Sequence, residues 1–499
     1  MTHLLMSTFP SLQNLTSLSN FGRSISAPAY LYRPTSAGQI AELFRRAEQT
    51  GYTIGLRGAG RSYGDAALNS GQVVLDLRRF NRILEWNPQT GVIRVEPGVT
   101  IQQLWQITLE DGWWPPVVPG TQFPTLGGCL GMNIHGKNNY HMGPIGEHVL
   151  AFTALLPTGE EITCAPAQNA DLFYSLISSA GTLGVFTSIT LQLKRLYSGL
   201  LDVEAWTAPN LRAAFNDIEA HKDEDYIVGW VDSIAGGNAL GRAELHRAAY
   251  LPAGADPDAS RTLTPDYQTL PDTFLGLLPK SAMWRFMAPF FNNLGMGVVN
   301  FGKYLVARFQ NHHHYRQSLI AFNFLFDYVP NWERAYGPRG LIQYQAFIPR
   351  ATAPDAFTAL LQLAQKRGLP NYLSVIKRHR PDNFLFTHAV EGYSMAMDYR
   401  VPRDVLALQR LANDLNCLVL DAGGRFYFAK DSTLTPEAAT RFLGEETLAR
   451  FRALKTRCDP HAILQTDLYR RLLRDSTTPS VTPPPVADVL FANRTPIQK

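Results

Sequence analysis

The amino-acid sequence predicts a mixed fold of α-helices and β-strands, and three observations support this. Residues 36–105 alternate between helix and strand patterns, and residues 354–420 repeat such a pattern. The chain is 45% hydrophobic and only 18% charged, which is the composition of a globular protein with a full core. With 499 residues, it is long enough for two to four domains.

The first helix is predicted from its start and stop signals. Ser36 and Gln39 form a capping box, apolar residues follow at helical spacing, and Gly51 ends the segment. The residues before it, 1–35, are polar and predicted to be irregular. Strands are expected at 52–56, 73–77 and 92–96.

A second capping box, Thr100 with Gln103, begins the next helix. Further elements are expected as strands at 149–156 and 185–193 and a helix at 171–179. Near Tyr197 the pattern changes to one richer in aromatic residues with longer loops, which predicts a domain boundary. From Ser476 the chain is rich in proline and threonine, which is typical of a disordered tail.

Charge and cysteine usage limit the classes of function. A net charge of +4 without a dense Lys/Arg block gives no reason to expect nucleic-acid binding. The four cysteines are scattered, which favours a reducing compartment and a cytoplasmic location. Residues 1–21 have no signal-peptide pattern, and no uninterrupted apolar run of about 18 residues predicts a transmembrane helix.

Two sets of glycine-rich loops lie within residues 56–137. The first reads LRGAGRSYGD from Leu56, and the second comprises PGT, TLGG and NIHGK, ending at Lys137. Glycine lets a ligand approach bare backbone N–H groups, so the pair predicts a cradle for a large phosphate-bearing cofactor. Tyr63 occupies the third glycine position of the GxGxxG fingerprint, which disfavours an NAD-binding Rossmann fold.

In their order and spacing, GAGRSYGD, TLGG, IHGKN and AGTLG resemble the FAD-binding domain of the vanillyl-alcohol oxidase family, also called the PCMH-type fold, over residues 27–197. The resemblance implies an α+β fold with a two-subdomain FAD-binding domain and a substrate-binding domain built on an antiparallel sheet with flanking helices. It implies the following division: FAD-binding domain 1–197, substrate-binding domain 198–423, a C-terminal segment 424–475 that returns to the FAD domain, and the tail 476–499.

Longer segments, RGAGRSYGDAALN, HGKNNYHMG, WERAYGPRGLIQYQ and GGRFYFAKDS, resemble the decaprenylphosphoryl-ribose 2'-oxidase group. This implies oxidation of a secondary alcohol of a sugar, or of a polyprenyl-phosphate-linked sugar, by hydride transfer to flavin N5. It also implies a separate NAD(P)H-dependent ketoreductase that would complete an epimerisation. Two alternatives stay open: a soluble alditol or aldonolactone oxidase on the same fold, and a non-catalytic flavin- or polyprenyl-lipid-binding protein.

The resemblance also assigns site residues. Lys430, His135, Tyr427 and Lys137 receive catalytic roles, with Lys430 or His135 as the base and Lys430 or Lys137 stabilising the reduced flavin. FAD contacts are expected from Arg57, Gly58, Ala59, Gly60, Arg61, Ser62, Tyr63, Gly64, Gly120, Thr125, Gly127, Gly128, Asn133, His135, Gly184, Val185 and Tyr427. Substrate contacts are expected from Gln343, Gln345, Lys377, Ser394 and Ala396.

The sequence departs from the family at three positions. Some members bond the flavin covalently through a histidine in the first loop; Arg61 occupies the comparable position here, which predicts a dissociable, non-covalent FAD. Ser394 and Ala396 stand where group members inhibited by nitro-aromatics carry Asn and Cys. The substrate pocket is therefore expected to have a different shape on this side.

Two further stretches admit more than one interpretation. Residues 281–309 are apolar with interspersed Lys and Arg, and Pro289 and three glycines are expected to interrupt any helix. This stretch is either core and substrate-pocket wall, or a surface that touches a lipid tail or a membrane face. The adjacent histidines 312–314 cannot converge on one ion from a regular helix or strand, so no metal site is predicted.

Overall fold

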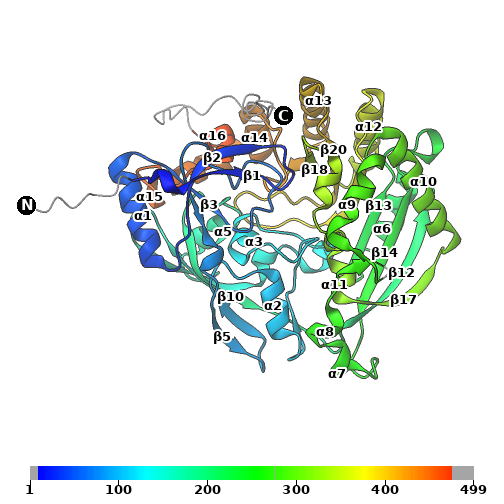
Figure 1. Cartoon of the computed structure of the whole chain (residues 1–499), viewed down its shortest axis with the longest axis horizontal. Coiled ribbons are helices and arrows are strands. Elements are labelled where there is room, and N and C mark those ends of the chain that lie inside the picture. The colour runs from blue at the N-terminus through cyan, green and yellow to red at the C-terminus, as the bar shows by residue number, and fades with distance from the viewer. Residues whose placement is uncertain (1–8, 275, 475–499) are drawn as a thin grey trace, which may run out of the picture.

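The computed structural model describes residues 9–274 and 276–474, so the predicted tail 476–499 lies outside the described residues. Figure 1 shows two parts side by side, an N-terminal part with two small sheets and a second part built on one large sheet. Helices and antiparallel sheets are combined throughout, which is the predicted α+β class.

The first sheet has the strand order β1-β2-β4-β3, with β2 and β3 parallel to β4. Its strands are β1 (Leu15–Ser19), β2 (Ser26–Tyr32), β3 (Ile54–Arg57) and β4 (Val73–Asp76). The prediction that residues 1–35 are irregular is wrong for 15–19 and 26–32, which form β1 and β2; alternate residues of β2 are buried where it pairs with β4. Helix α1 (Ala37–Thr50) starts and stops as predicted: Ser36 accepts the N–H of Gln39, and Gly51 takes φ 74°.

The second sheet is antiparallel, with the order β5-β6-β10-β8-β9. Its strands are β5 (Ile83–Asn87), β6 (Val92–Val95), β8 (Val149–Leu155), β9 (Glu161–Cys164) and β10 (Val185–Gln192). Helix α2 (Ile101–Thr108) begins with the complete predicted capping box. Helix α5 (Ala170–Leu176) ends earlier than predicted, because Ile177 is extended and Ser178 has a positive φ.

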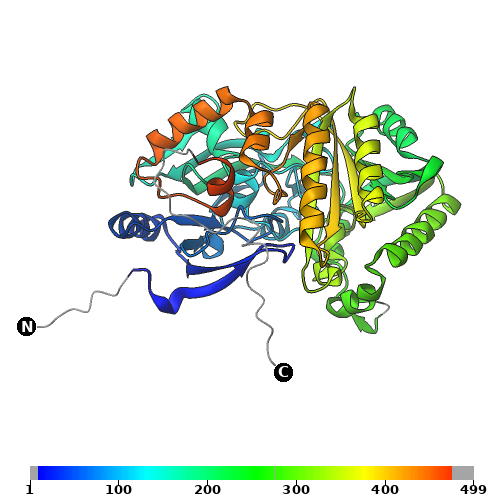
Figure 2. The same cartoon turned by 90° about the horizontal axis from the view of Figure 1, so that it is seen from above.

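The second part is an antiparallel eight-stranded sheet with the order β17-β12-β14-β13-β19-β20-β18-β21. Its strands are β12 (Leu200–Ala208), β13 (Tyr226–Val231), β14 (Ala243–Tyr250), β17 (His313–Ser318), β18 (Leu341–Pro349), β19 (Leu373–His379), β20 (Gly392–Arg400) and β21 (Arg425–Phe426). Helices α6 (Leu211–Ala220), α12 (Ala353–Lys366) and α13 (Val405–Asp421) cover one face. The other face is turned toward the N-terminal part and toward α10 (Figure 2).

Residues 281–309 form α9 (Met283–Met287), a short 3-10 turn and α10 (Asn293–Phe309). The expected break falls at Pro289, in the 3-10 turn between α9 and α10, but the three glycines do not interrupt a helix, because all three lie within the continuous α10. A helical glycine costs only about 1 kcal/mol, and buried Met296, Asn300 and Tyr304 anchor α10 to the protein. Among the described residues, no helix is both long enough and apolar enough to cross a bilayer.

The C-terminal segment returns to the N-terminal part (Figure 1). It comprises α14 (Pro436–Leu443), α15 (Glu445–Cys458) and α16 (Asp467–Leu472). Leu464 bridges to Ile54 on β3, and Arg471 donates two hydrogen bonds of 2.7 and 2.8 Å to the carboxylate of Asp65. The C-terminal segment therefore fixes the loop that follows β3.

Candidate functional site

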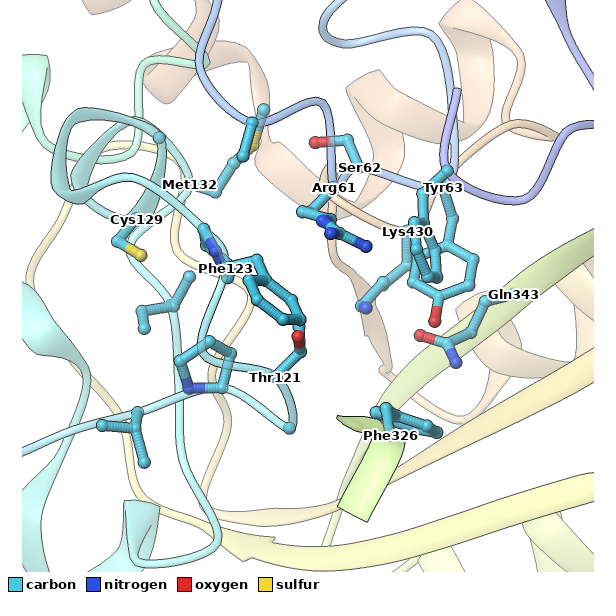
Figure 3. A pocket seen from close by; sticks show the side chains of 18 of the residues that line it. Arg61, Ser62, Tyr63, Thr121, Phe123, Cys129, Met132, Phe326, Gln343 and Lys430 are labelled. Carbon is cyan, nitrogen blue, oxygen red and sulfur yellow. The ribbon is translucent and has the colours of Figure 1, made fainter. Parts of the chain in front are cut away.

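A cavity of about 930 Å³ lies between the glycine-rich loops and the open face of the eight-stranded sheet. Figure 3 shows Arg61, Ser62 and Tyr63 of the first loop around it, with Lys430 and Gln343 beside Tyr63. Phe123 and Cys129 lie on the opposite side, before and within helix α3 (Leu126–Gly131). The prediction of a loop at TLGG is wrong, because Thr125 caps α3 and Leu126, Gly127 and Gly128 form its first turn. Both sets of loops predicted from the sequence therefore meet at one cavity, together with the large sheet.

The first loop presents bare backbone because side chains would not fit at its glycines. Gly60 has φ +65°, and a Cβ there would collide with the guanidinium of Arg57. That guanidinium is itself held in place, because it donates to the carbonyl oxygens of Ala67 at 3.1 Å and Ser19 at 2.9 Å. A Cβ on Gly58 would collide with Thr125 Oγ1 of the second set of loops. The first loop therefore packs directly against Thr125, and this contact requires glycine at position 58.

The floor of the cavity comes from three neighbouring strands in fixed register. Alternate residues of β18, β19 and β20 share one face, because side chains of a strand repeat every second residue. Three cross-strand pairs form this floor: Gln343–Asp398, Gln345–Ala396 and Lys377–Ser394. All five substrate residues predicted from the sequence therefore lie together on this patch of the sheet.

A chain of hydrogen bonds runs beneath the floor. Gln345 Nε2 lies 3.1 Å from His135 Nε2 and 3.2 Å from Ser394 Oγ, so its two N–H groups serve both acceptors. Ser394 then donates to His379 Nε2 at 2.7 Å, and His379 Nδ1 donates to Asn139 Oδ1 at 2.8 Å. In this arrangement His135 carries its proton on Nδ1. That atom is buried and has no partner in the described structure.

Three partly buried lysines converge on the cavity. Burial lowers the pKa of Lys137 to about 7, that of Lys377 to about 8 and that of Lys430 to about 7. Lys137 donates to the carbonyl oxygen of Phe322, and Lys430 Nζ lies 4.0 Å from the centre of the Tyr63 ring. Burial, followed by the neighbouring Lys377, also lowers the pKa of His135 well below its usual value. A negatively charged group bound in the cavity would therefore stabilise the protonated form of these lysines.

Asp398 is a polar residue of this site that the sequence interpretation missed. It is fully buried, and burial raises its pKa to about 7. Its Oδ1 accepts from Gln343 Nε2 at 2.5 Å, and the carboxylate in turn raises the pKa of Lys430. The available signal was strand alternation, because Asp398 follows Ser394 and Ala396 at two-residue spacing. His379 was missed as well, two residues beyond Lys377 on β19.

Four predicted site residues do not line the cavity. Gly64 packs on the backbone of Asp431, Asn133 Oδ1 accepts the N–H of Gly146 at 3.0 Å, and Val185 belongs to the core. Ser394 is on the same face of the sheet but does not line the cavity, and it accepts a hydrogen bond from Gln345. The other predicted residues line the cavity: Arg57, Gly58, Ala59, Gly60, Arg61, Ser62, Tyr63, Gly120, Thr125, Gly127, Gly128, His135, Lys137, Gly184, Gln343, Gln345, Lys377, Ala396, Tyr427 and Lys430.

The outer end of the cavity lies under α10 and was not predicted residue by residue. It is lined by Trp230, Glu244, His246, Lys303, Tyr315 and Gln317. Lys303 reaches down from α10, pairs with Glu244 and lies 4.3 Å from the centre of the Trp230 ring. The cavity therefore extends from the glycine loops, past the three lysines, to the side of α10.

Comparison with known proteins identifies related sequences. A family described as "FAD binding domain" matches residues 28–165. Decaprenylphosphoryl-beta-D-ribose oxidase of Mycolicibacterium smegmatis is 29% identical over 442 residues, which cover 87% of this chain and 92% of that protein. D-arabinono-1,4-lactone oxidase of Yarrowia lipolytica is 26% identical over 38% of each chain. L-gulonolactone oxidase of Mus musculus is 28% identical over 40% of this chain and 45% of that protein.

The residues present fit FAD as the cofactor. The N–H groups of residues 58–62 donate no hydrogen bond within the described structure and line the cavity, where a diphosphate needs donors. Glycine at 58 and 60 lets this backbone pack closely against Thr125 and Arg57. His135 Nδ1 is a buried donor that lacks a protein acceptor, as expected where a ligand oxygen supplies one. The loop residues from Arg57 to Tyr63 would hold the diphosphate, and His135 and Tyr427 would border the ring system.

Proposed function

We propose that this chain, an FAD-dependent oxidoreductase with a PCMH-type FAD-binding domain that acts on CH–OH groups, oxidises a secondary alcohol of a sugar linked to a polyprenyl phosphate. The observation that carries the proposal is the convergence of Lys137, Lys377 and Lys430 on one cavity with two oriented amides. A neutral polyol offers no charge to offset the partly buried ammonium groups of Lys137 and Lys377, whereas a phosphoryl-linked sugar does.

Lys430 is the preferred proton acceptor. FAD, when bound, supplies the hydride acceptor for the alcohol carbon. Lys430 has a pKa of about 7, so a large fraction is neutral at neutral pH and can take the hydroxyl proton. His135 is the weaker candidate, because its Nε2 already accepts from Gln345 and its Nδ1 carries the proton. We therefore assign His135 as a hydrogen-bond donor.

Gln343 and Gln345 are proposed to orient the sugar hydroxyls. Both side chains are buried in the cavity floor, and each is held from behind, Gln343 by Asp398 and Gln345 by Ser394. Such second partners fix the amide rotamers before the substrate arrives, which lowers the entropic cost of orienting it. Lys137 and Lys377 are proposed to contact the phosphoryl group.

The names of the relatives support a sugar-like substrate. The link of that sugar to a polyprenyl phosphate is our proposal. The relative named as a decaprenylphosphoryl-ribose oxidase aligns over most of both chains. By analogy, oxidation would be the first half of an epimerisation that a separate NAD(P)H-dependent ketoreductase completes. We further propose a cytoplasmic enzyme peripheral to the membrane, consistent with the free thiols of Cys129, Cys164, Cys417 and Cys458.

A soluble aldonolactone or alditol oxidase is the second candidate. It is favoured by the two lactone oxidases that align with parts of the chain. In that case Lys137 and Lys377 would have no phosphoryl group to contact. The outer end of the cavity, under α10, would stay unused by a free sugar. A protein that binds flavin or polyprenyl lipid without turnover is the third candidate.

An anaerobic half-reaction separates these candidates. The FAD-loaded protein would be mixed with a polyprenyl-phosphoryl pentose, an alditol or an aldonolactone, and the visible flavin absorbance followed. We expect bleaching by the phosphoryl sugar only. In Lys430→Met we expect FAD content to be unchanged and the bleaching rate to fall by about 10² to 10⁴. The exposed Lys366→Met serves as the matched control. Preferential bleaching by the lactone would favour the second candidate, and persistent colour with every compound the third.

A further inference from the structure

The outward face of α10 is apolar, which is the reverse of an ordinary surface helix. Five residues at intervals of three or four form one stripe, and each is at least 39% exposed: Leu294, Val298, Phe301, Leu305 and Phe309. The inward face carries a polar residue instead, since Asn300 is buried and donates to Asp232 at 3.3 Å. With 17 residues, the stripe is about 25 Å long.

The stripe belongs to a larger apolar surface. Of the 20 exposed large hydrophobic side chains in the described part of the chain, 12 fall between residues 277 and 325. Phe286 and Phe290, just before α10, are 59% and 51% exposed. Contiguous apolar surface of this kind marks an interaction site in a protein that otherwise buries its hydrophobic residues.

The charge of this segment has one sign. Residues 273–326 contain no Asp or Glu, whereas they contain Lys280, Arg285, Lys303, Arg308 and Arg316. Within the described residues, Arg285 and Arg308 are exposed and form no ion pair. Apolar side chains flanked by unpaired cations complement the headgroup boundary of an anionic bilayer, where the rings insert and the cations meet phosphate.

The surface also lies next to the cavity. Lys303 projects from the inward face of α10 into the outer end of the cavity, beside Trp230 and Glu244. Figure 2 shows α10 at the end of the molecule opposite to α1, on the side of the sheet away from α12 and α13. A bilayer that met the stripe would therefore be separated from the outer end of the cavity only by the thickness of α10.

We propose that residues 283–309 form a docking surface for an anionic lipid bilayer, with the stripe of α10 inserted among the headgroups. Docking would bring the outer end of the cavity to the membrane, where the prenyl tail of a substrate stays in the lipid while its sugar enters. The docking itself stands on the surface described above; the delivery of substrate rests on the proposed function.

Vesicle binding tests the docking without catalysis. The FAD-loaded protein would be sedimented with vesicles of phosphatidylcholine alone or with phosphatidylglycerol added. We expect binding to the anionic vesicles only. The variant Val298→Ser/Phe301→Ser/Leu305→Ser should bind on the order of 100-fold less tightly, because three side chains no longer enter the lipid. Arg285→Gln/Arg308→Gln should weaken binding and its dependence on phosphatidylglycerol.

The chain offers a matched control for the serine variant. Ile107, Leu150 and Leu406 are exposed to a similar degree on other elements, so their triple serine variant removes comparable apolar surface. We expect it to bind vesicles like the wild type. Equal loss in both triple variants, or none in the α10 variant, would overturn the proposal. A wild-type dimer that only the α10 variant dissociates, without vesicle binding, would also overturn it and assign the face to a second copy.

A second measurement separates docking from the proposed function. Oxidation of a short-chain, water-soluble prenyl-phosphoryl sugar should be unchanged in the α10 serine variant. Oxidation of the long-chain substrate embedded in vesicles should fall in proportion to the loss of binding. Turnover of neither substrate by a wild type that still binds vesicles would refute the proposed function and leave the docking surface supported.

Discussion

Gln345 Nε2 lies 3.1 Å from His135 Nε2, so one amide joins the sheet of the second part to the loops of the first. The same nitrogen lies 3.2 Å from Ser394 Oγ on the neighbouring strand. The position of Gln345 in the cavity floor is therefore set by two partners rather than by packing alone. Such a buried amide loses much of its orientation if either partner is removed.

Replacing Ser394 tests this arrangement. In Ser394→Ala, Gln345 loses an acceptor and His379 Nε2 loses its donor, so we expect KM for the sugar to rise about tenfold with a smaller change in kcat. Ser394→Asn should restore most of the loss, because an amide can accept from Gln345 and donate to His379. Steady-state kinetics would measure both. Wild-type kinetics in Ser394→Ala would show that the serine hydroxyl has no role.

The dependence of the rate on pH reports the base. Lys430 accepts a proton only when neutral, so kcat/KM should rise with pH and level off above its pKa of about 7. The Asp398 carboxylate raises that pKa, so in Asp398→Asn the rise should move to lower pH. Dye-coupled oxidation across this range provides the measurement. A profile that keeps its position in Asp398→Asn would argue against Lys430 as the titrating group.

Cysteine placed at position 396 would test the floor of the cavity. Ala396 lines the cavity opposite Gln345, whereas of the four native cysteines only Cys417 is exposed. In a Cys417→Ser background we expect little labelling by a maleimide, and about one label per chain after Ala396→Cys. Bound substrate should slow that labelling. Labelling that substrate leaves unchanged would place residue 396 outside the substrate site.

The attachment of FAD can be measured directly. Arg61 lies with its guanidinium carbon 5.1 Å from the centre of the Phe21 ring and 5.0 Å from that of Phe123, and it cannot form the flavin bond that a histidine could. We therefore expect acid precipitation to release all flavin into the supernatant as FAD. Yellow colour that stays with the precipitated protein would contradict the prediction of a non-covalent cofactor.

Local signals in the sequence predicted the N-terminal part best. The helix starts at Ser36 and Thr100 depend only on residues within three positions. The glycine loops are recognised from their composition. The polar residues on the sheet were harder. Gln343 and Lys377 came from resemblance, whereas Asp398 and His379 are ordinary strand residues until the register of β18, β19 and β20 brings them together.

The apolar stretch 281–309 shows a different limit of prediction from sequence. Periodicity places Leu294, Val298, Phe301 and Leu305 on one helical face, and such a face normally packs against the core. The same pattern describes a helix that turns this face outward. Only the burial of Asn300 and Tyr304 on the other side shows which way α10 faces. One expectation was a pocket wall, and Lys303 of this stretch does line the cavity. The other expectation was an exposed surface.

The clasp between the first glycine loop and the C-terminal segment bears on how the protein matures. Tyr63 donates its N–H to the carbonyl of Ala429 at 2.9 Å, and Asp65 is bound by Arg471, more than 360 positions later. During synthesis the loop emerges from the ribosome long before these partners exist. We therefore expect tight retention of FAD only after the segment that contains Ala429 and Arg471 has been made.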